Sequence, residues 1–145
     1  MPEVLEVQPE VKEKILEILK SYDAIMVATT GGEYSPWILG AYFGHNDMKI
    51  YLLLETHGKS FGNIQINNKV AISISRNDAM QDFLQGSGEA VIMDVSEDKV
   101  ARDLILDKMP SFQTYTPVTP IRIDIKKFFV TSLQNGWFPA KMLEV

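Results

Sequence analysis

Apolar side chains recur at helical spacing near the start of the chain and then gather in short, nearly continuous runs. Between Pro9 and Tyr22, valine, isoleucine and leucine fall on one face of a helical repeat while glutamate and lysine occupy the other, which predicts an amphipathic helix. The runs at 24–30 and 34–43 are separated by Gly31-Gly32 and predict a hairpin. A further run at 48–54 predicts a third strand, which leads directly into a polar loop.

The second half of the chain continues the pattern of short strands. Strands are predicted at 69–75, 83–94, 121–125 and 128–133. Gly86-Ser87-Gly88 interrupts the longest of them and indicates a bulge or a sharp bend. A helical pattern begins at Ser96 and stops before Pro110. Parallel folds need a helical crossover after nearly every strand, so these strands with few helices predict an antiparallel barrel with peripheral helices.

Length and composition bound the partners of the chain. Its 145 residues fit a single domain over residues 1–145. With 14 basic and 19 acidic residues the formal charge is −5, so no nucleic-acid partner is expected. The absence of cysteine excludes disulfides and thiolate chemistry. No apolar run approaches the ~20 residues that span a bilayer, and the acidic segment 1–6 does not resemble a signal peptide, so we expect a cytoplasmic protein without membrane attachment.

The polar loop from Glu55 to Ser60 has the composition of a phosphate-binding site. It follows a predicted strand and precedes a short helical segment, and the first amides of a helix have no internal hydrogen-bond partner. Gly58 lets the backbone approach a ligand closely, and Lys59 supplies a positive charge. Thr56 and Ser60 supply hydroxyl groups. The loop therefore predicts an anion-binding site at a strand-to-helix junction.

Several other chemistries lack the residues that they need. A nucleoside-triphosphate P-loop would require glycine where the chain has Leu53, and it would lie in a parallel sheet, so that class is excluded. His45 and His57 are the only histidines, and no motif places them on one metal, so no metal site is predicted. His57 either faces a ligand or is an ordinary loop residue. Trp37 and Trp137 either wall a flat ligand or pack in the core or an interface.

Four short motifs follow one another from the polar loop onward. They are Lys59-Ser60, Asn63-Ile64, Asn67-Asn68 and Val70. This order resembles the pyridoxamine 5′-phosphate oxidase-like, FMN-binding split-barrel superfamily, in which a Lys/Arg/Ser cluster precedes an Asn-Leu pair, an Asn-Pro pair and a valine. The similarity covers most of residues 23–133 and includes the glycine-bearing segment 85–90. It implies a mainly β, α+β fold: an antiparallel split β-barrel of about six or seven strands with peripheral helices.

The resemblance also implies a cofactor and a partner. Members are usually homodimers that hold FMN in a groove at the subunit interface, with its phosphate on the loop and its ring along the second strand. A tryptophan of the tail would approach from the other subunit. The implied cofactor-binding residues are Trp37, Ile38, Leu39, Gly40, Leu53, Leu54, Thr56, Lys59, Ser60, Asn63 and Trp137.

The chain departs from true pyridoxamine 5′-phosphate oxidases in its charge. Those enzymes carry more arginine and lysine around both phosphates, whereas the strand 37–42 offers no cation, so oxidation of vitamin B6 is not expected. The resemblance implies instead an FMN-dependent oxidoreductase or electron-transfer protein, with its catalytic residues and substrate undefined. Relatives that bind haem or a deazaflavin, or that bind nothing, leave two alternatives: a ligand-binding or sensing module without turnover, and a structural dimer with an empty groove.

Overall fold

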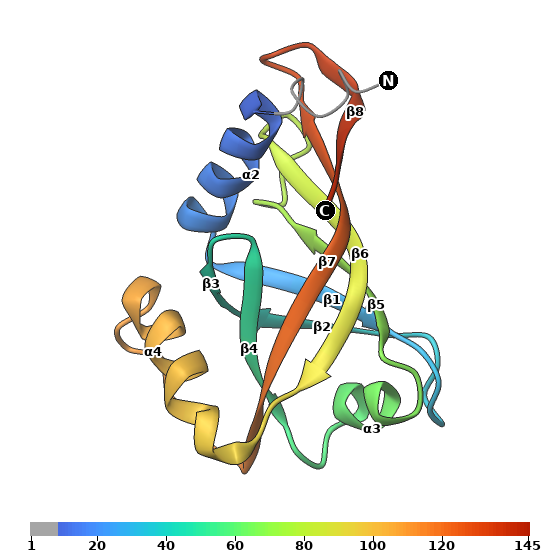
Figure 1. The fold of residues 1–145 in the computed structure, drawn as a ribbon, viewed down its shortest axis with the longest axis vertical. Helices are drawn as coiled ribbons and strands as arrows, with labels where there is room; N and C mark the ends of the chain where they lie inside the picture. Colours follow the sequence, from blue (N-terminus) through green and yellow to red (C-terminus); the bar gives the residue numbers. More distant parts are fainter. Residues whose placement is uncertain (1–8) are drawn as a thin grey trace.

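A computed structural model describes residues 9–145 as one strongly curled antiparallel sheet with helices packed around it (Figure 1). The elements are α2 (Pro9–Ser21), β1 (Ala24–Thr29), β2 (Trp37–Tyr42), β3 (Gly44–Asn46), β4 (Lys49–Glu55), α3 (Lys59–Ile66), β5 (Lys69–Ile74), β6 (Phe83–Ile92), the 3-10 helix η1 (Val95–Glu97), α4 (Asp98–Lys108), β7 (Val118–Ser132) and β8 (Trp137–Glu144). The predicted antiparallel split barrel with peripheral helices is confirmed. The acidic segment 1–6 lies outside the described residues.

The sheet is organised around its longest strand, β7. Neighbouring strands follow the order β2-β1-β5-β6-β7-β4-β3, and β8 adds to β7 outside this path. β7 pairs with β6 along most of its length, with β4 over residues 118–123 and with β8 over residues 127–132. Every pairing is antiparallel and the sheet curls. The chain leaves β4, forms α3 and enters β5 at one end of the molecule, so α3 lies at that end (Figure 1).

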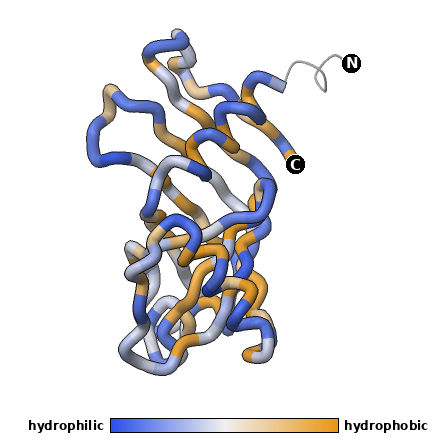
Figure 2. Tube along the Cα trace, turned by 90° about the vertical axis from the view of Figure 1, so that its left-hand side faces the viewer, coloured by the Kyte–Doolittle hydropathy of each residue, from blue (hydrophilic) through white to orange (hydrophobic). Residues whose placement is uncertain are grey.

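The hydrophobic core lies inside the curl and beneath α2. Buried and partly exposed positions alternate along β4, where Ile50, Leu52 and Leu54 point inward. The predicted helix at the start of the chain is confirmed, and its buried residues are Val11, Ile15, Ile18 and Leu19. Hydrophobic segments gather within the sheet and hydrophilic ones on the connecting loops (Figure 2). Within residues 9–145, no helix combines the length and apolar character that crossing a bilayer requires.

The last part of the sheet differs from the prediction. The segments 121–125 and 128–133 form one continuous strand, β7, and the tail that follows forms β8 rather than an irregular end. The alternation of buried residues slips at Lys126 and Lys127, which are both exposed, and the register with β6 shifts at the same level, between Ser87 and Gly88. A β-bulge absorbs this slip. A Cβ atom on Gly88 would lie 2.7 Å from the Cα atom of Ile125, so glycine is required there.

Helix α4 approaches the sheet most closely at Gly44 of β3. A Cβ atom placed on Gly44 would lie 2.5 Å from both the carbonyl carbon and the Cβ atom of Leu104, and backbone cannot move aside as a flexible side chain can. The absence of a side chain at Gly44 therefore sets how closely α4 packs on β3.

This contact gives a prediction with a matched control. Gly44→Ala should lower the free energy of unfolding by about 1–3 kcal/mol, because α4 must shift to admit the methyl group. Gly62→Ala is the control, since a Cβ at Gly62 in α3 meets nothing within 4 Å, and alanine should stabilise a helix interior by about 0.5–1 kcal/mol. Urea denaturation followed by circular dichroism measures both values. Equal effects of the two substitutions would show that the approach of α4 is not tight.

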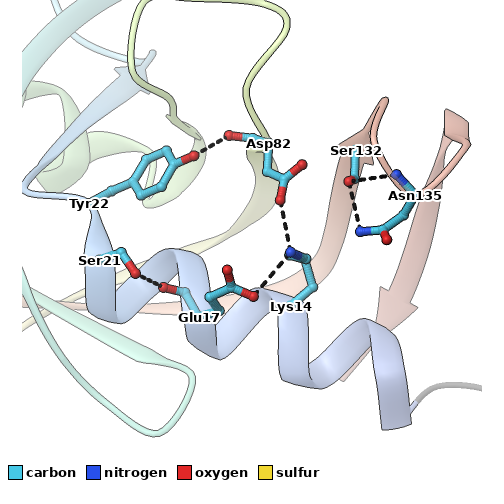
Figure 3. Close-up of polar contacts among 7 residues, drawn as sticks. All are labelled: Lys14, Glu17, Ser21, Tyr22, Asp82, Ser132 and Asn135. Carbon is cyan, nitrogen blue, oxygen red and sulfur yellow. Dashed lines mark hydrogen bonds and ion pairs between the residues drawn. The ribbon is translucent and has the colours of Figure 1, made fainter.

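An ion pair links α2 to the loop before β6, away from α3 (Figure 3). The Nζ atom of Lys14 lies 2.8 Å from Oδ2 of Asp82, and both side chains are about 85% buried, at 16% and 15% exposure. The hydroxyl of Tyr22 donates to the main-chain carbonyl of Asp82 at 2.6 Å. Nearby, Ser132 accepts hydrogen bonds from the backbone and side-chain nitrogens of Asn135. The first two contacts connect α2 and Tyr22 to the loop before β6, and the bonds of Ser132 lie within the turn between β7 and β8.

Candidate functional site

The predicted phosphate loop lies between β4 and α3, as the sequence indicated. Gly58 is the N-cap of α3 and has an extended backbone, with φ −87° and ψ 169°. No side chain caps the helix, and its first turn contains no acidic residue. The first amides of α3 therefore have no side-chain acceptor. The carboxylate of Glu55 also lines this end of the helix, where the hydroxyl of Thr116 donates to it at 2.9 Å. This helix end is suited to an anion.

A cavity of about 230 Å³ opens at this helix end. Its apolar walls come from β2, β4 and α3, and its polar groups come from the loop and the first turn of α3. The lining residues on which its chemistry depends are Trp37, Leu39, Leu54, Lys59, Ser60 and Phe61. Ser60 is only 4% exposed, and its hydroxyl has no hydrogen-bond partner among the described residues. A buried hydroxyl without a protein partner is costly, so this group is available to donate a hydrogen bond into the cavity.

Two aromatic rings hold the side chain of Lys59 beside the cavity. Its Nζ atom lies 4.9 Å from the ring centre of Tyr34 and 5.2 Å from that of Trp37. The two rings contact each other edge to face, with centroids 6.2 Å apart. Such cation–π contacts are worth about 0.5–1 kcal/mol at exposed sites. They restrict where the ammonium group can lie and leave its charge available to a bound anion.

Asn63 fixes the turn that carries Tyr34. It is 1% exposed, and its side-chain amide donates to the hydroxyl of Thr29 at 3.0 Å and to the carbonyl of Tyr34 at 2.8 Å. The structure thus shows that the Asn63 side chain links α3 to the β1–β2 turn. Its role as a phosphate ligand stays a prediction. Sequence reasoning did not single out Tyr34. Tyr34 follows Gly31-Gly32 directly after Glu33 and lies three residues before Trp37, and this nearness of a second aromatic residue to Trp37 is the signal that could have identified it.

A second and more open cavity, of about 570 Å³, lies on the other side of Lys59. His57, Gly58 and Lys59 line both cavities, so the two meet at the N-terminus of α3. Asn63 lines the second cavity and does not line the first. The candidate site is thus a pair of hollows joined at a helix end that is suited to an anion.

Comparison with known proteins identifies the fold. No protein-family model matches the sequence, and no curated protein matches it. A haem-binding protein from Mycobacterium smegmatis gives a TM-score of 0.76 at 16% identity, over 94% of this chain and 58% of that protein. General stress protein 26 from Bacillus anthracis gives 0.70 at 19% identity, over 93% of this chain and 98% of that protein.

A third solved structure is assigned to the pyridoxinephosphate oxidase family. It is a protein related to general stress protein 26 from Clostridium acetobutylicum, and it gives a TM-score of 0.71 at 16% identity, over 94% of this chain and 95% of that one. The chain has the pyridoxamine 5′-phosphate oxidase-like split-barrel fold. At these identities the likeness is one of fold, and the chain spans 58% of the length of the haem-binding protein.

The split barrel does not bring every predicted cofactor contact into the cavity of one chain. Leu53 and Leu54 point to opposite faces of β4, and only Leu54 lines the cavity. Ile38 lies on the outer face of β2 and is 59% exposed, and Gly40 lies on the same face. The hydroxyl of Thr56 is hydrogen-bonded at 2.8 Å to that of Thr119.

Trp137 lies far from the cavity within one split barrel. It begins β8, and the turn before β8 is at the opposite end of the molecule from α3 (Figure 1). It packs against the edge of the core, and the Nζ atom of Lys141 lies 5.1 Å from the centre of its ring. Trp137 can therefore meet a ligand at α3 only if a second copy of the chain supplies it.

Proposed function

We propose that the chain is an FMN-binding protein of electron or hydride transfer, with the FMN phosphate at the N-terminus of α3. The buried hydroxyl of Ser60 carries the proposal, because it has no hydrogen-bond partner within residues 9–145 and lies in the first turn of a helix that no side chain caps. Lys59 adds a charge that the Tyr34 and Trp37 rings orient. The single loop thus offers three kinds of phosphate donor: backbone amides, a hydroxyl and an ammonium group.

The remaining wall of the cavity suits a flat, largely apolar ring. Trp37, Leu39, Leu54 and Phe61 line it, and aromatic and aliphatic side chains of this kind favour ring burial. When bound, FMN supplies one- or two-electron redox chemistry, so no acid or base from the protein is needed. The chain's residues would orient the ring and exclude water from it. Among the described residues, Lys59 is the one lysine or arginine that lines the cavity, and the apolar wall away from it offers no cation for the separate phosphate of pyridoxamine phosphate.

A homodimer would complete the site. Met26, Ile38 and Tyr42 lie on one outward face of β1 and β2, and they are 41%, 59% and 45% exposed. Exposed apolar side chains that cluster on one face favour a protein partner. In a dimer through this face, Ile38 and Gly40 would lie at the interface, and Trp137 of the second copy would be available to the ligand. Sedimentation of the purified protein measures this association directly.

Flavin titration tests the proposed function. The purified protein should quench the fluorescence of added FMN, and Lys59→Met should weaken FMN binding by roughly 10- to 100-fold, equivalent to about 1.5–3 kcal/mol for a hydrogen bond to a charged group. Riboflavin, which has no phosphate, should bind the two proteins equally. Lys69→Met is the control, because Lys69 is exposed on β5 and pairs with Glu89. A protein that binds no FMN, or a Lys59→Met variant that binds it unchanged, would refute the proposal.

A second candidate function is haem binding without turnover. One solved structure with this fold is named as a haem-binding protein, and His57 lines both cavities, where an imidazole could ligate iron. Addition of haemin should then give a Soret band that shifts in His57→Ala. If added FMN gives a yellow complex and added haemin gives no shifted Soret band, the flavin function is favoured over haem binding.

A further inference from the structure

The second cavity continues the phosphate site rather than forming a separate hollow. It begins at His57, Gly58 and Lys59, the three residues that it shares with the first cavity. Its volume of about 570 Å³ exceeds the 230 Å³ of the first. An FMN phosphate bound at α3 would therefore lie at the junction of two hollows, with the second left unfilled.

The lining of the second cavity has the chemistry of a nucleoside site. Tyr34 and Ile66 present apolar surface to it and are 48% and 71% exposed, so both are accessible to a ligand. Gln65 also lines the cavity, and a side-chain amide can pair with the N6 and N7 positions of adenine. Glu33 offers a carboxylate that can accept hydrogen bonds from ribose hydroxyls.

The open space beside α3 and the charge of Glu33 both limit the kind of ligand that the second cavity can hold. Gly62 lines the cavity, and a Cβ atom there would meet nothing within 4 Å, so the hollow is open beside the helix. The carboxylate of Glu33 would repel a polyanionic tail, such as a chain of glutamates, but tolerates a neutral nucleoside. The anionic part of the ligand would stay near Lys59, His57 and the amides of α3, where a pyrophosphate finds its donors.

We propose that the ligand extends past its first phosphate into the second cavity as an adenosine nucleotide, so that FAD binds this chain more tightly than FMN. This inference rests on the proposed flavin function of the same site. FAD contains the FMN unit, which keeps the first cavity and the Ser60 contact. Its second phosphate would lie at the junction, and its adenosine between Tyr34, Gln65 and Ile66.

Titration with FMN and FAD separates this inference from the proposed function. The wild-type protein should bind FAD at least 10-fold more tightly than FMN. Gly62→Leu should fill the second cavity and remove that advantage, while FMN binding changes less than 2-fold because Gly62 does not line the first cavity. Gly62→Ala is the size control and should keep most of the FAD preference. Gln65→Ala, on the exposed face of α3, should weaken FAD alone by about 5- to 10-fold.

The outcomes distinguish the two proposals. If FMN binds and FAD binds no more tightly, or if Gly62→Leu weakens both flavins equally, the extension into the second cavity is wrong and the proposed function stands. If neither flavin binds, both are wrong. A preference for FAD that Gly62→Leu abolishes and Gln65→Ala reduces would support the nucleoside site.

Discussion

Lys14→Met should lower the free energy of unfolding by about 1.5–3 kcal/mol, the range for a hydrogen bond to a charged group, because both side chains of the pair are largely but not fully buried. The Asp82 carboxylate would stay about 85% buried and lose its cation, while Tyr22 would still hold the backbone of Asp82 in place. Lys12→Met, at an exposed position of the same helix, is the control for the change of side chain. Urea denaturation measures both variants, and equal losses would contradict a stabilising role for the pair.

The Lys14–Asp82 pair also makes the free energy of unfolding depend on pH. Burial of the Asp82 carboxyl raises its pKa, but the hydrogen bond and the charge of Lys14 outweigh burial, so the pKa lies below its ordinary value of 3.8. A carboxyl with a depressed pKa in the folded state stabilises the protein above pH 3.8, and this contribution is lost as the pH falls through the folded pKa. The double variant Lys14→Met, Asp82→Leu should therefore lose less stability than the wild type on acidification.

Asn63→Leu should lower the free energy of unfolding by about 2–4 kcal/mol, because leucine matches asparagine in size but leaves two acceptors without their donor. The hydroxyl of Thr29 and the carbonyl of Tyr34 would both lose a hydrogen bond in a buried or half-buried place. Gln65→Leu, exposed on the same helix, should change stability by less than about 0.5 kcal/mol.

The two Asn63 bonds also predict a change at the site. Once the β1–β2 turn is released from α3, Tyr34 no longer positions the Lys59 ammonium, so Asn63→Leu should weaken FMN binding and Gln65→Leu should not. Flavin titration at a temperature where both variants are folded measures the difference. If Asn63→Leu loses stability but binds FMN normally, the turn supports the fold and does not position Lys59.

Local patterns predicted most of the elements, and non-local contacts account for what they missed. The periodicity of α2 and the short apolar runs of β1 and β4 are properties of a few adjacent residues, so the sequence was sufficient there. The division of β7 into two predicted strands was wrong, because a slip of one residue at Lys126-Lys127 looks like a strand end until the bulge in its pairing with β6 is known. That information lies about forty residues away in the chain.

The candidate site shows the same limit. The loop 55–60 was found from its composition, and the structure places Lys59, Ser60 and Leu54 around one cavity. The alternation of side chains along the predicted strand 48–54 already implies that Leu53 and Leu54 face opposite sides of the sheet. Family order could not say that the Asn63 amide would bind the β1–β2 turn. Whether Ile38, Gly40 and Trp137 contact a ligand depends on a second copy, which no pattern within one chain can place.

The central position of β7 also bears on how the chain is completed during synthesis. The hairpin of β3 and β4 joins the rest of the sheet only through β7, which begins more than sixty residues after β4 ends. Until the ribosome has released residues 118–123, the inward side chains of β4, Ile50, Leu52 and Leu54, have no strand beside them on that edge. A nascent chain holds this apolar edge open while the residues between β4 and β7 are made, a period in which chaperones would find it accessible.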